Sequence, residues 1–480
     1  MKIYSVKINF LLNTLNTCLS FLFPLITFPY VSRVLGASSY GCAEYAIQTV
    51  TFFALFASLG VNLYGIRECA KVRDNKHSLS KVSQELTIII SISTIVVLIV
   101  YAGSIALIPS FRSQAILFGI AGLSIPCTSL GASWFLTANE QYIFMAVRSI
   151  ASYLLIVIFM FIFVQSSTDV IAWTAISLGG ISLSNIAGFI YMKTHTKFLR
   201  ICQLELAKHF KPIILFFLTS AATSIYTGLD TVMLGTMTNT EQVGYYAVAV
   251  KIKNVLTAIM GALAGVIIPR IAYCLSKNDT ESIKRLISST VRLALIYAPF
   301  AVACVCIFAS TIITLLAGDE YNNSIILLQI MMPAFFCICF SYITSQEFMT
   351  PFGFEKQMTI SYLCAGAINL LLNLALIPLF GALGAASATT VSEVFVLFYQ
   401  AIILSRHFNL PEYCQGVTKI IIPVAISIGI VCTISFFLGT SLVSAIIAIA
   451  TGVFALLLGL LLSGEELVLD FIRSLPFLKK

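Results

Sequence analysis

The sequence predicts an all-α protein that crosses a membrane many times, through about fourteen transmembrane helices. Only 10% of its 480 residues are charged and 59% are hydrophobic, whereas about 25% of the residues of a soluble domain are charged. Long apolar runs recur along the chain, and each approaches the length of about 20 residues that a helix needs to cross a bilayer. Membrane β-barrels show short alternating segments instead, so helices are the predicted spanning elements.

The first apolar run follows a basic N-terminus, as the apolar run of a signal peptide would. It continues through Pro24 and Pro29 to about Val31 with no small-residue cleavage site, so we expect a first membrane helix that is retained. Charged and turn-forming residues separate the later runs, with an uncertainty of about 2–4 residues at each boundary. The predicted spans are 8–32, 42–65, 85–108, 115–138, 142–165, 170–192, 212–238, 243–270, 288–316, 322–349, 357–379, 382–405, 417–439 and 441–463.

The distribution of positive charge supports an even number of spans. With fourteen spans, 24 of the 28 lysines and arginines lie on one face of the membrane, called here the basic face. Only Arg33 and Arg112 lie on the opposite face, and Lys251 and Lys253 lie inside a span. The positive-inside rule then places both termini in the cytoplasm. The net charge of +8 is therefore mainly a topological signal and does not indicate nucleic-acid binding.

A weak internal repeat predicts two bundles. The segment that ends at Gly36 and continues with Tyr40-Gly41 is similar to the segment that ends at Gly235 and continues with Val243-Gly244. Six spans separate the copies, so they share one orientation, and such parallel repeats are one transporter design with the substrate between the halves. We expect six-helix bundles at 1–200 and 208–407, followed by two additional helices and a cytoplasmic tail at 408–480.

The chain shows no signature of an enzyme. No predicted loop exceeds roughly 25 residues, and no metal-ligand spacing or nucleophile motif is present. The 13 cysteines are scattered through apolar runs, where free cysteine behaves as a small hydrophobic residue. We therefore expect a transporter that needs no metal or other cofactor.

Two lysines lie at membrane depth, where a charged side chain is costly and normally faces a cavity or a partner. At 1.5 Å per residue, Lys251 and Lys253 lie about 12 Å and about 15 Å from the outer end of the eighth span. They are two residues apart and do not share a helix face. We favour Lys251 as the residue that lines a water-filled cavity, with pairing to an acid or snorkelling as the alternative. Which of the two faces the cavity is left open.

Other polar residues are secondary candidates. Glu393 lies about 16 Å below the outer end of the twelfth span and is expected either to pair with Lys251 or to carry a coupling proton. Asp230 is a functional acid or a local hydrogen-bond acceptor, Arg33 a gate residue or an interfacial anchor, and Arg67 a ligand or a topological charge. Asparagines within spans usually join helices and are weak evidence for a sugar-binding lining; these are Asn13, Asn16, Asn62, Asn185, Asn369 and Asn373.

Three segments resemble a known family. They are FPLITFPYVSRVLG (23–36), LYGIRECAKVRDNK (63–76) and LDTVMLGTMTNTEQVGYYAVAVKI (229–252). Together they are similar to Wzx-type polysaccharide flippases of the multidrug/oligosaccharidyl-lipid/polysaccharide (MOP) superfamily, which includes the MATE exporters. The resemblance covers most of the chain and weakens after about residue 410.

This resemblance implies two six-helix bundles around a central cationic cavity. Lys251 falls within a residue of a cavity-facing arginine of the related lipid II flippases, and Arg33 and Arg67 match basic residues after the first two spans of the family. The multidrug exporters of the superfamily carry an acid in their first span, and residues 8–35 contain none.

The functional hypothesis is a flippase that moves undecaprenyl-diphosphate-linked oligosaccharide repeat units, of O-antigen or a similar surface polysaccharide, across the bacterial inner membrane by alternating access. Lys251 would hold the diphosphate, with Lys253, Arg33 and Arg67 as further candidates. The expected partners are the lipid-linked oligosaccharide, membrane lipid, and the polymerase and chain-length proteins of the same pathway. The alternatives are a cation-coupled multidrug antiporter of the same fold and a membrane polysaccharide polymerase. The sugar, the coupling ion and the oligomeric state are left open.

Overall fold

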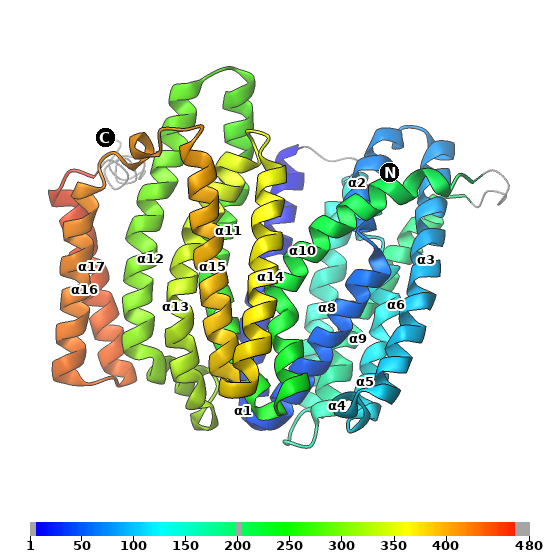
Figure 1. Ribbon diagram of the computed structural model, residues 1–480, viewed down its shortest axis with the longest axis horizontal. Coiled ribbons are helices and arrows are strands. Elements are labelled where there is room, and N and C mark those ends of the chain that lie inside the picture. The colour runs from blue at the N-terminus through cyan, green and yellow to red at the C-terminus, as the bar shows by residue number, and fades with distance from the viewer. Residues whose placement is uncertain (1–5, 198–203, 466–480) are drawn as a thin grey trace. The chain divides into compact units, whose positions relative to one another are not determined.

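The computed structural model describes residues 6–197 and 204–465, and this part of the chain consists of helices and short connections without strands (Figure 1). The chain forms two compact units, residues 1–247 and 248–480. The fold expected from the sequence, an all-helical membrane protein, is confirmed. Large apolar side chains point outward from the helices, as lipid-facing residues do; for example, Leu107 is 83% exposed and Phe436 is 84% exposed.

The first unit is built from ten helices and the first turns of an eleventh. Its longest helix, α1, is broken at Gly36, where φ is 73°, a conformation that glycine adopts without steric cost. The predicted spans 8–32 and 42–65 therefore lie on the two sides of this break. The helices are α1 (Val6–Ser58), α2 (Val61–Val72), α3 (Lys76–Leu107), α4 (Pro109–Arg112), α5 (Ala115–Gly122), α6 (Ser124–Ser129), α7 (Ser133–Ala138), α8 (Tyr142–Phe163), α9 (Val170–His195), α10 (Ala207–Met237) and α11 (Thr240–Ser276).

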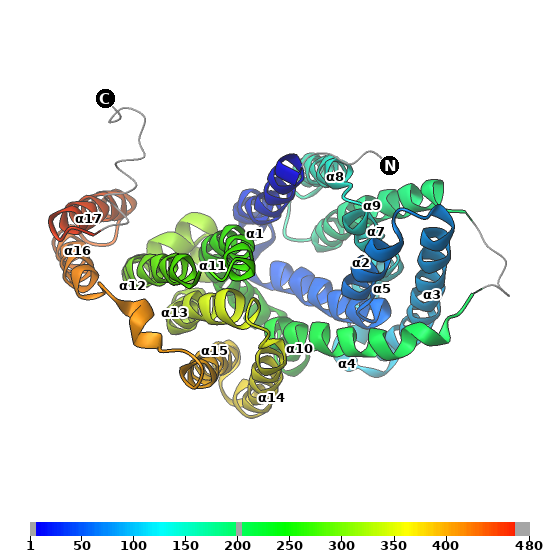
Figure 2. The ribbon, with the colours of Figure 1, turned by 90° about the horizontal axis from the view of Figure 1, so that it is seen from above.

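The second unit contains the rest of α11 and six further long helices. In Figure 2, α16 and α17 lie side by side at the edge of this unit, and α12 packs against them. One helix, α13, continues into a π-helix, η3, at its end on the basic face. The elements are α12 (Thr280–Leu316), η2 (Asp319–Tyr321), α13 (Asn323–Tyr342), η3 (Ile343–Met349), α14 (Glu355–Phe380), α15 (Ala382–Ser405), η4 (Leu410–Cys414), α16 (Thr418–Leu438) and α17 (Leu442–Leu462).

Every predicted span overlaps a helix of the structure. Within the described residues, eleven helices are long and apolar enough to cross a membrane, and up to twelve if the bent pair 26–58 and 61–72 counts as one span. The chain is thus a multi-pass membrane protein, and the number fourteen stays a prediction. The limits 1–200, 208–407 and 408–480 of the bundles and the additional helices also stay a prediction; the compact units meet between residues 247 and 248.

Two glycines bring α1 and the beginning of α11 into backbone contact within the first unit. A Cβ atom on Gly41 would lie 1.8 Å from the carbonyl oxygen of Thr240, and one on Gly244 would lie 2.1 Å from the carbonyl oxygen of Ala37. The same separation along the chain relates Gly41 to Gly244 and Ala37 to Thr240. The contact is therefore reciprocal, as expected of two copies of the predicted repeat that meet across a pseudo-two-fold axis.

Candidate functional site

The first unit contains a polar cavity of about 280 Å³. It is enclosed by α1, α2, α6 and α10, and six of its ten lining residues carry hydroxyl or amide side chains, while none is charged. The lining residues are Gln48, Thr51, Phe52, Ala54, Leu55, Ser58, Asn62, Thr128, Ser224 and Gly228.

The predicted span boundaries place the cavity near mid-membrane depth. Gln48 follows the break at Gly36 by twelve residues, which corresponds to about 18 Å along the helix, and the hydrocarbon core is about 30 Å thick. Neutral donors and acceptors at this depth are costly unless they have polar partners. A ligand with many hydroxyl groups would supply such partners, so the lining suits a sugar better than an apolar or cationic ligand.

Close packing of α1 against α10 shapes one wall of the cavity. A Cβ atom on Gly228 would lie 3.3 Å from the Phe52 ring and 3.6 Å from Oε1 of Gln48. The Thr51 hydroxyl donates to the carbonyl oxygen of Ile47 at 2.7 Å, so its oxygen keeps the capacity to accept a hydrogen bond from a ligand.

The two predicted arginine ligands do not line this cavity. Arg33 is exposed on α1, three residues before the break at Gly36. Arg67 lies on α2 with a side chain that is 55% exposed; its Nε lies 3.2 Å from Oε1 of Glu68, and its guanidinium lies 5.6 Å from the centre of the Phe216 ring. These contacts fit the interpretation of Arg67 as a topological charge, and the role of both arginines in substrate binding stays a prediction.

The two lysines of α11 lie in different environments, as the helical period requires. Lys251 is half-buried, whereas Lys253 is only 7% exposed. Both belong to the second unit. The greater exposure of Lys251 agrees with the preference for Lys251 as the cavity residue, which stays a prediction.

Both predicted acids are buried. Asp230 is 3% exposed, and its Oδ2 accepts a hydrogen bond from the Tyr246 hydroxyl at 2.6 Å. This bond ties α10 to the first turns of α11 and favours the interpretation of Asp230 as a local acceptor. Glu393 lies on α15 and is 7% exposed, in a part of the second unit that also holds Tyr342 and Tyr362.

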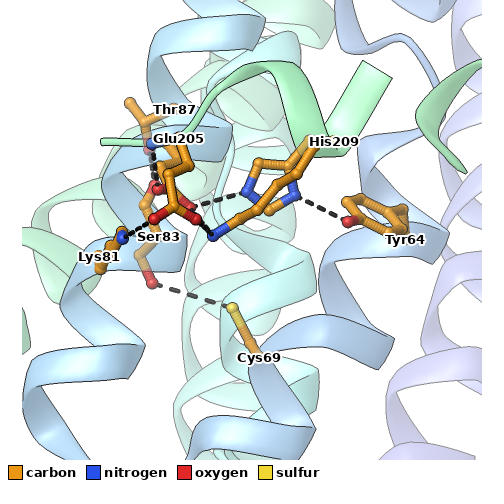
Figure 3. Close-up of polar contacts among 9 residues, drawn as sticks. Tyr64, Cys69, Lys81, Ser83, Thr87, Glu205 and His209 are labelled. Carbon is orange, nitrogen blue, oxygen red and sulfur yellow. Dashed lines mark hydrogen bonds and ion pairs between the residues drawn. The ribbon is translucent and has the colours of Figure 1, made fainter. Parts of the chain in front are cut away.

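An ionic cluster around the buried Glu85 carboxylate links α2, α3 and α10 (Figure 3). The carboxylate of Glu85 on α3 is fully buried and accepts from His209 Nε2 at 2.7 Å, from the backbone N–H of Glu205 at 2.7 Å and from Lys208 Nζ at 3.2 Å. The Tyr64 hydroxyl lies 2.7 Å from His209 Nδ1. We call these five residues the Glu85 cluster.

The cluster connects elements that also form the site. Tyr64 lies on α2 two residues after Asn62, which lines the cavity, and His209 lies in the first turn of α10, which supplies Ser224 and Gly228. A carboxylate can only accept hydrogen bonds, so Nε2 of His209 carries a proton, and in the neutral ring Nδ1 accepts from Tyr64. Outside the membrane span, hydrogen bonds from Lys81 and Lys208 hold the pKa of the Glu205 carboxyl below its usual value.

Sequence reasoning missed this cluster. Its partners Glu85 and His209 are 124 residues apart, and the acid lies at the very start of a predicted span, where an unpaired charge is ordinary. The part of the chain that the structure describes contains no group of three or more His, Cys, Asp or Glu residues that could hold a metal ion.

Residues 6–274 match the family described as polysaccharide biosynthesis protein. The chain belongs to this family. Residues 212–375 also match the MatE family, which agrees with the expected MOP superfamily.

Curated relatives share this relationship over most of their length. A protein described as an O-antigen transporter in Escherichia coli strain K12 is 25% identical over 78% of this chain and 91% of its own. A protein with the same description in Shigella dysenteriae is 25% identical over 82% of this chain and 98% of its own. A low-salt glycan biosynthesis flippase of Haloferax volcanii is 25% identical over 35% of each chain.

Solved structures show the same fold. The lipid II flippase MurJ in an inward closed conformation aligns with a TM-score of 0.76 and 16% identity, over 95% of this chain and 99% of that one. A multidrug resistance MATE transporter in an inward-facing conformation aligns with a TM-score of 0.60 and 13% identity, over 80% and 95% of the two chains. The fold is therefore that of MurJ and the MATE transporters.

Proposed function

We propose that this protein is a flippase for lipid-linked oligosaccharide repeat units of O-antigen or a similar surface polysaccharide. The observation that carries the proposal is the uncharged hydroxyl- and amide-lined cavity at mid-membrane depth in the first unit. The family relationship and the relatives described as O-antigen transporters point to the same cargo.

In the proposed mechanism, the cavity binds the sugars while cationic residues hold the diphosphate. Lys251 and Lys253 are the principal candidates, and Arg33 and Arg67 are secondary ones. A charge pair at 4 Å is several times stronger at the reduced dielectric of a protein than in bulk water, and lysine acts as a point-charge ligand for phosphate. The undecaprenyl tail stays in lipid while alternating access moves the head group, with Glu393 or Asp230 as a candidate for the coupling step.

The proposed location is the bacterial inner membrane, with both termini in the cytoplasm. This orientation rests on the concentration of lysine and arginine on one face. In this setting the polymerase and the chain-length protein of the same pathway would receive the translocated repeat units.

The test uses a strain that lacks the gene, complemented with variants and assayed for surface polysaccharide. The Lys251→Ala/Lys253→Ala variant should reduce surface glycan about 10- to 100-fold, because a hydrogen bond to a charged group contributes about 1.5–3 kcal/mol. Gln48→Leu should reduce it about 2- to 10-fold, because a hydrogen bond between neutral groups contributes about 0.5–1.5 kcal/mol. Lys71→Ala, which removes an exposed cation paired with Glu68, is the control and should leave export unchanged. Membrane protein levels are measured by immunoblot for every variant.

Three outcomes would contradict the proposal. Normal export in both test variants would remove the cavity and the lysines from the transport path. Normal export combined with altered drug resistance would favour the multidrug antiporter. Accumulation of unpolymerised repeat units on the outer leaflet of the deletion strain would favour the polymerase.

A further inference from the structure

The second unit contains a buried carboxyl group that the proposed transport path does not use. Glu347 lies in η3 and is 1% exposed. Its Oε2 atom has no hydrogen-bond partner among the residues that the structure describes. Among the described residues, the side chain within hydrogen-bonding distance of the Glu347 carboxyl is that of Thr290 on α12.

The unusual backbone of η3 places Glu347 in this position. From Ile343 to Met349 the chain forms a π-helix, and the Thr350 N–H donates to the carbonyl oxygen of Ser345, five residues back, at 3.0 Å. π-helical turns are rare and occur frequently at functional sites. The wider turn directs Glu347 toward the interior, where η3 packs against α12, α14 and α15.

Within residues 6–197 and 204–465, no lysine, arginine or histidine forms an ion pair with the carboxyl, whose side-chain hydrogen-bond contact is Thr290. On α12, Arg292 lies 3.0 Å from Glu465 and Lys284 lies 2.9 Å from Glu412, so both contact other acids. The other packed elements carry one further cation, the exposed Lys356 beside Glu355 at the start of α14, and otherwise acids, tyrosines and cysteines: Cys337, Cys339 and Tyr342 on α13, Tyr362 and Cys364 on α14, Glu393 and Tyr399 on α15, and Tyr413 on η4.

Aromatic residues close the same end of the helix. The Phe348 ring lies 5.2 Å from Phe408 and 5.0 Å from Tyr413, and the Phe352 ring lies 4.9 Å from Phe408. These side chains keep η3, η4 and the connection after η3 packed together. In this packed arrangement Glu347 is 1% exposed and thus separated from water.

Burial and isolation decide the charge state of the carboxyl. Moving an ionised carboxylate into a low-dielectric interior without a partner costs so much free energy that such groups take up a proton instead. A neutral carboxyl has one O–H to donate and can still accept, so it satisfies Thr290 without a counter-ion. The packed arrangement of η3 is thus an arrangement in which Glu347 is protonated.

We propose that Glu347 is a proton-binding site that couples the closing of this end of the second unit to the uptake of one proton. Closing removes the carboxyl from water and binds the proton, and opening hydrates the carboxyl and releases it. By linkage, a fall in pH favours the closed arrangement. Only the coupling of this proton to lipid transport rests on the proposed function. Proton binding itself rests on the burial and contacts of Glu347.

The first test is infrared difference spectroscopy of the full-length purified protein, which reports the C=O stretch of protonated carboxyl groups. Wild type at neutral pH should show this band, with a shift in D₂O. The band should disappear in Glu347→Gln and remain in Glu355→Gln, a matched variant at an exposed position on α14. A band that persists in Glu347→Gln, or that is absent from wild type, overturns the proposal.

The second test measures stability against pH, because the neutral amide of Glu347→Gln mimics the protonated carboxyl. A folded state that binds a proton which the unfolded state has lost becomes less stable as pH rises. The unfolded carboxyl loses its proton above about pH 4.3, so wild type and Glu355→Gln should lose thermal stability from about pH 5 upward more steeply than Glu347→Gln. Equal slopes in all three proteins contradict the proposal, and a sodium-dependent slope would assign the site to Na⁺ and refute proton binding.

The third test separates the site from the transport hypothesis. Vesicles with wild type or Glu347→Gln receive a fluorescent undecaprenyl-diphosphate-linked oligosaccharide and an imposed pH gradient. The gradient should change the flipping rate at least about tenfold in wild type and have no effect in Glu347→Gln. If wild type moves no lipid but shows the infrared band, the proposed function fails and the proton site stands; if both proteins respond equally to the gradient, the coupling role fails.

Discussion

The Glu85 cluster should be one of the strongest single contributions to the stability of the first unit. His209→Ala removes a hydrogen bond at 2.7 Å from a fully buried carboxylate. Breaking a buried pair costs about 3–5 kcal/mol, because it leaves an uncompensated charge. We expect a value near 3 kcal/mol here, since Lys208 and the Glu205 N–H still contact the carboxylate.

A double-mutant cycle isolates the pair. Glu85→Ala should cost about 4 kcal/mol, because it leaves both His209 Nε2 and the Glu205 N–H without the carboxylate that accepts their hydrogen bonds. The double variant should cost about 2 kcal/mol less than the sum of the single variants, which is the range for a hydrogen bond to a charged group.

The assay is unfolding by SDS in mixed micelles, followed by intrinsic fluorescence. The chain has 2 tryptophans, and both lie in the first unit; Trp134 is 2% exposed and belongs to the same hydrophobic cluster as Tyr64. The fluorescence therefore reports the part of the molecule that the cluster stabilises. Lys71→Ala is the control, because exposed ion pairs contribute about 0–1 kcal/mol. A coupling free energy below about 0.5 kcal/mol, or a His209→Ala cost equal to that of Lys71→Ala, would refute the reasoning.

Three further predictions concern other parts of the molecule. Gly41→Ala should destabilise by at least about 1–3 kcal/mol through overpacking against backbone, whereas Gly103→Ala, which meets no atom within 4 Å, should be neutral or stabilising in the same unfolding assay. Arg292→Ala leaves the buried Glu465 carboxylate without its partner at 3.0 Å and should lower the free energy of unfolding by about 3–5 kcal/mol. The loss should appear as a lower Tm, measured by size-exclusion chromatography after heating. Arg292→Lys should restore part of the stability. Backbone and side-chain hydrogen bonds hold the pKa of Asp169 below its usual value. The order of loop 164–169 should therefore persist at neutral pH and be lost as pH falls through this lowered pKa. At neutral pH, amide hydrogen exchange of the loop should be faster in Asp169→Asn than in wild type.

The fold could be predicted because its cause is local and repeated. The length of each apolar run indicates a membrane-spanning helix. The Arg and Lys residues between the runs indicate which loops lie on the cytoplasmic side of the membrane. The different burial of Lys251 and Lys253 also follows from the sequence, because residues two apart on a helix face different directions. The break at Gly36 was predicted as a boundary between spans, and the structure shows it as a sharp change of direction within α1.

The site could be predicted only in part, because it depends on residues distant in sequence. Asn62 was identified as a weak sugar-binding candidate, but Gln48, Thr51 and Ser224 were not, since a single neutral polar residue in a span usually joins helices. Only the arrangement of α1, α2, α6 and α10 shows that these side chains surround one cavity. Glu347 escaped notice for another reason: at a span end it resembles an interfacial charge, and the π-helical turn that directs it inward has no known sequence signal.

The reciprocal glycine contact gives α11 a pivot point near its N-terminal end. The first turns of α11 touch the backbone of α1 at Gly41 and Gly244, and the same helix then continues into the second unit. The helix ends at Ser276, about 48 Å beyond Gly244, so a tilt of about 10° around this point would move the far end of the helix through roughly 8 Å. A small rotation of α11 at the glycine contact therefore moves the other end of the helix by a distance comparable to the width of a helix.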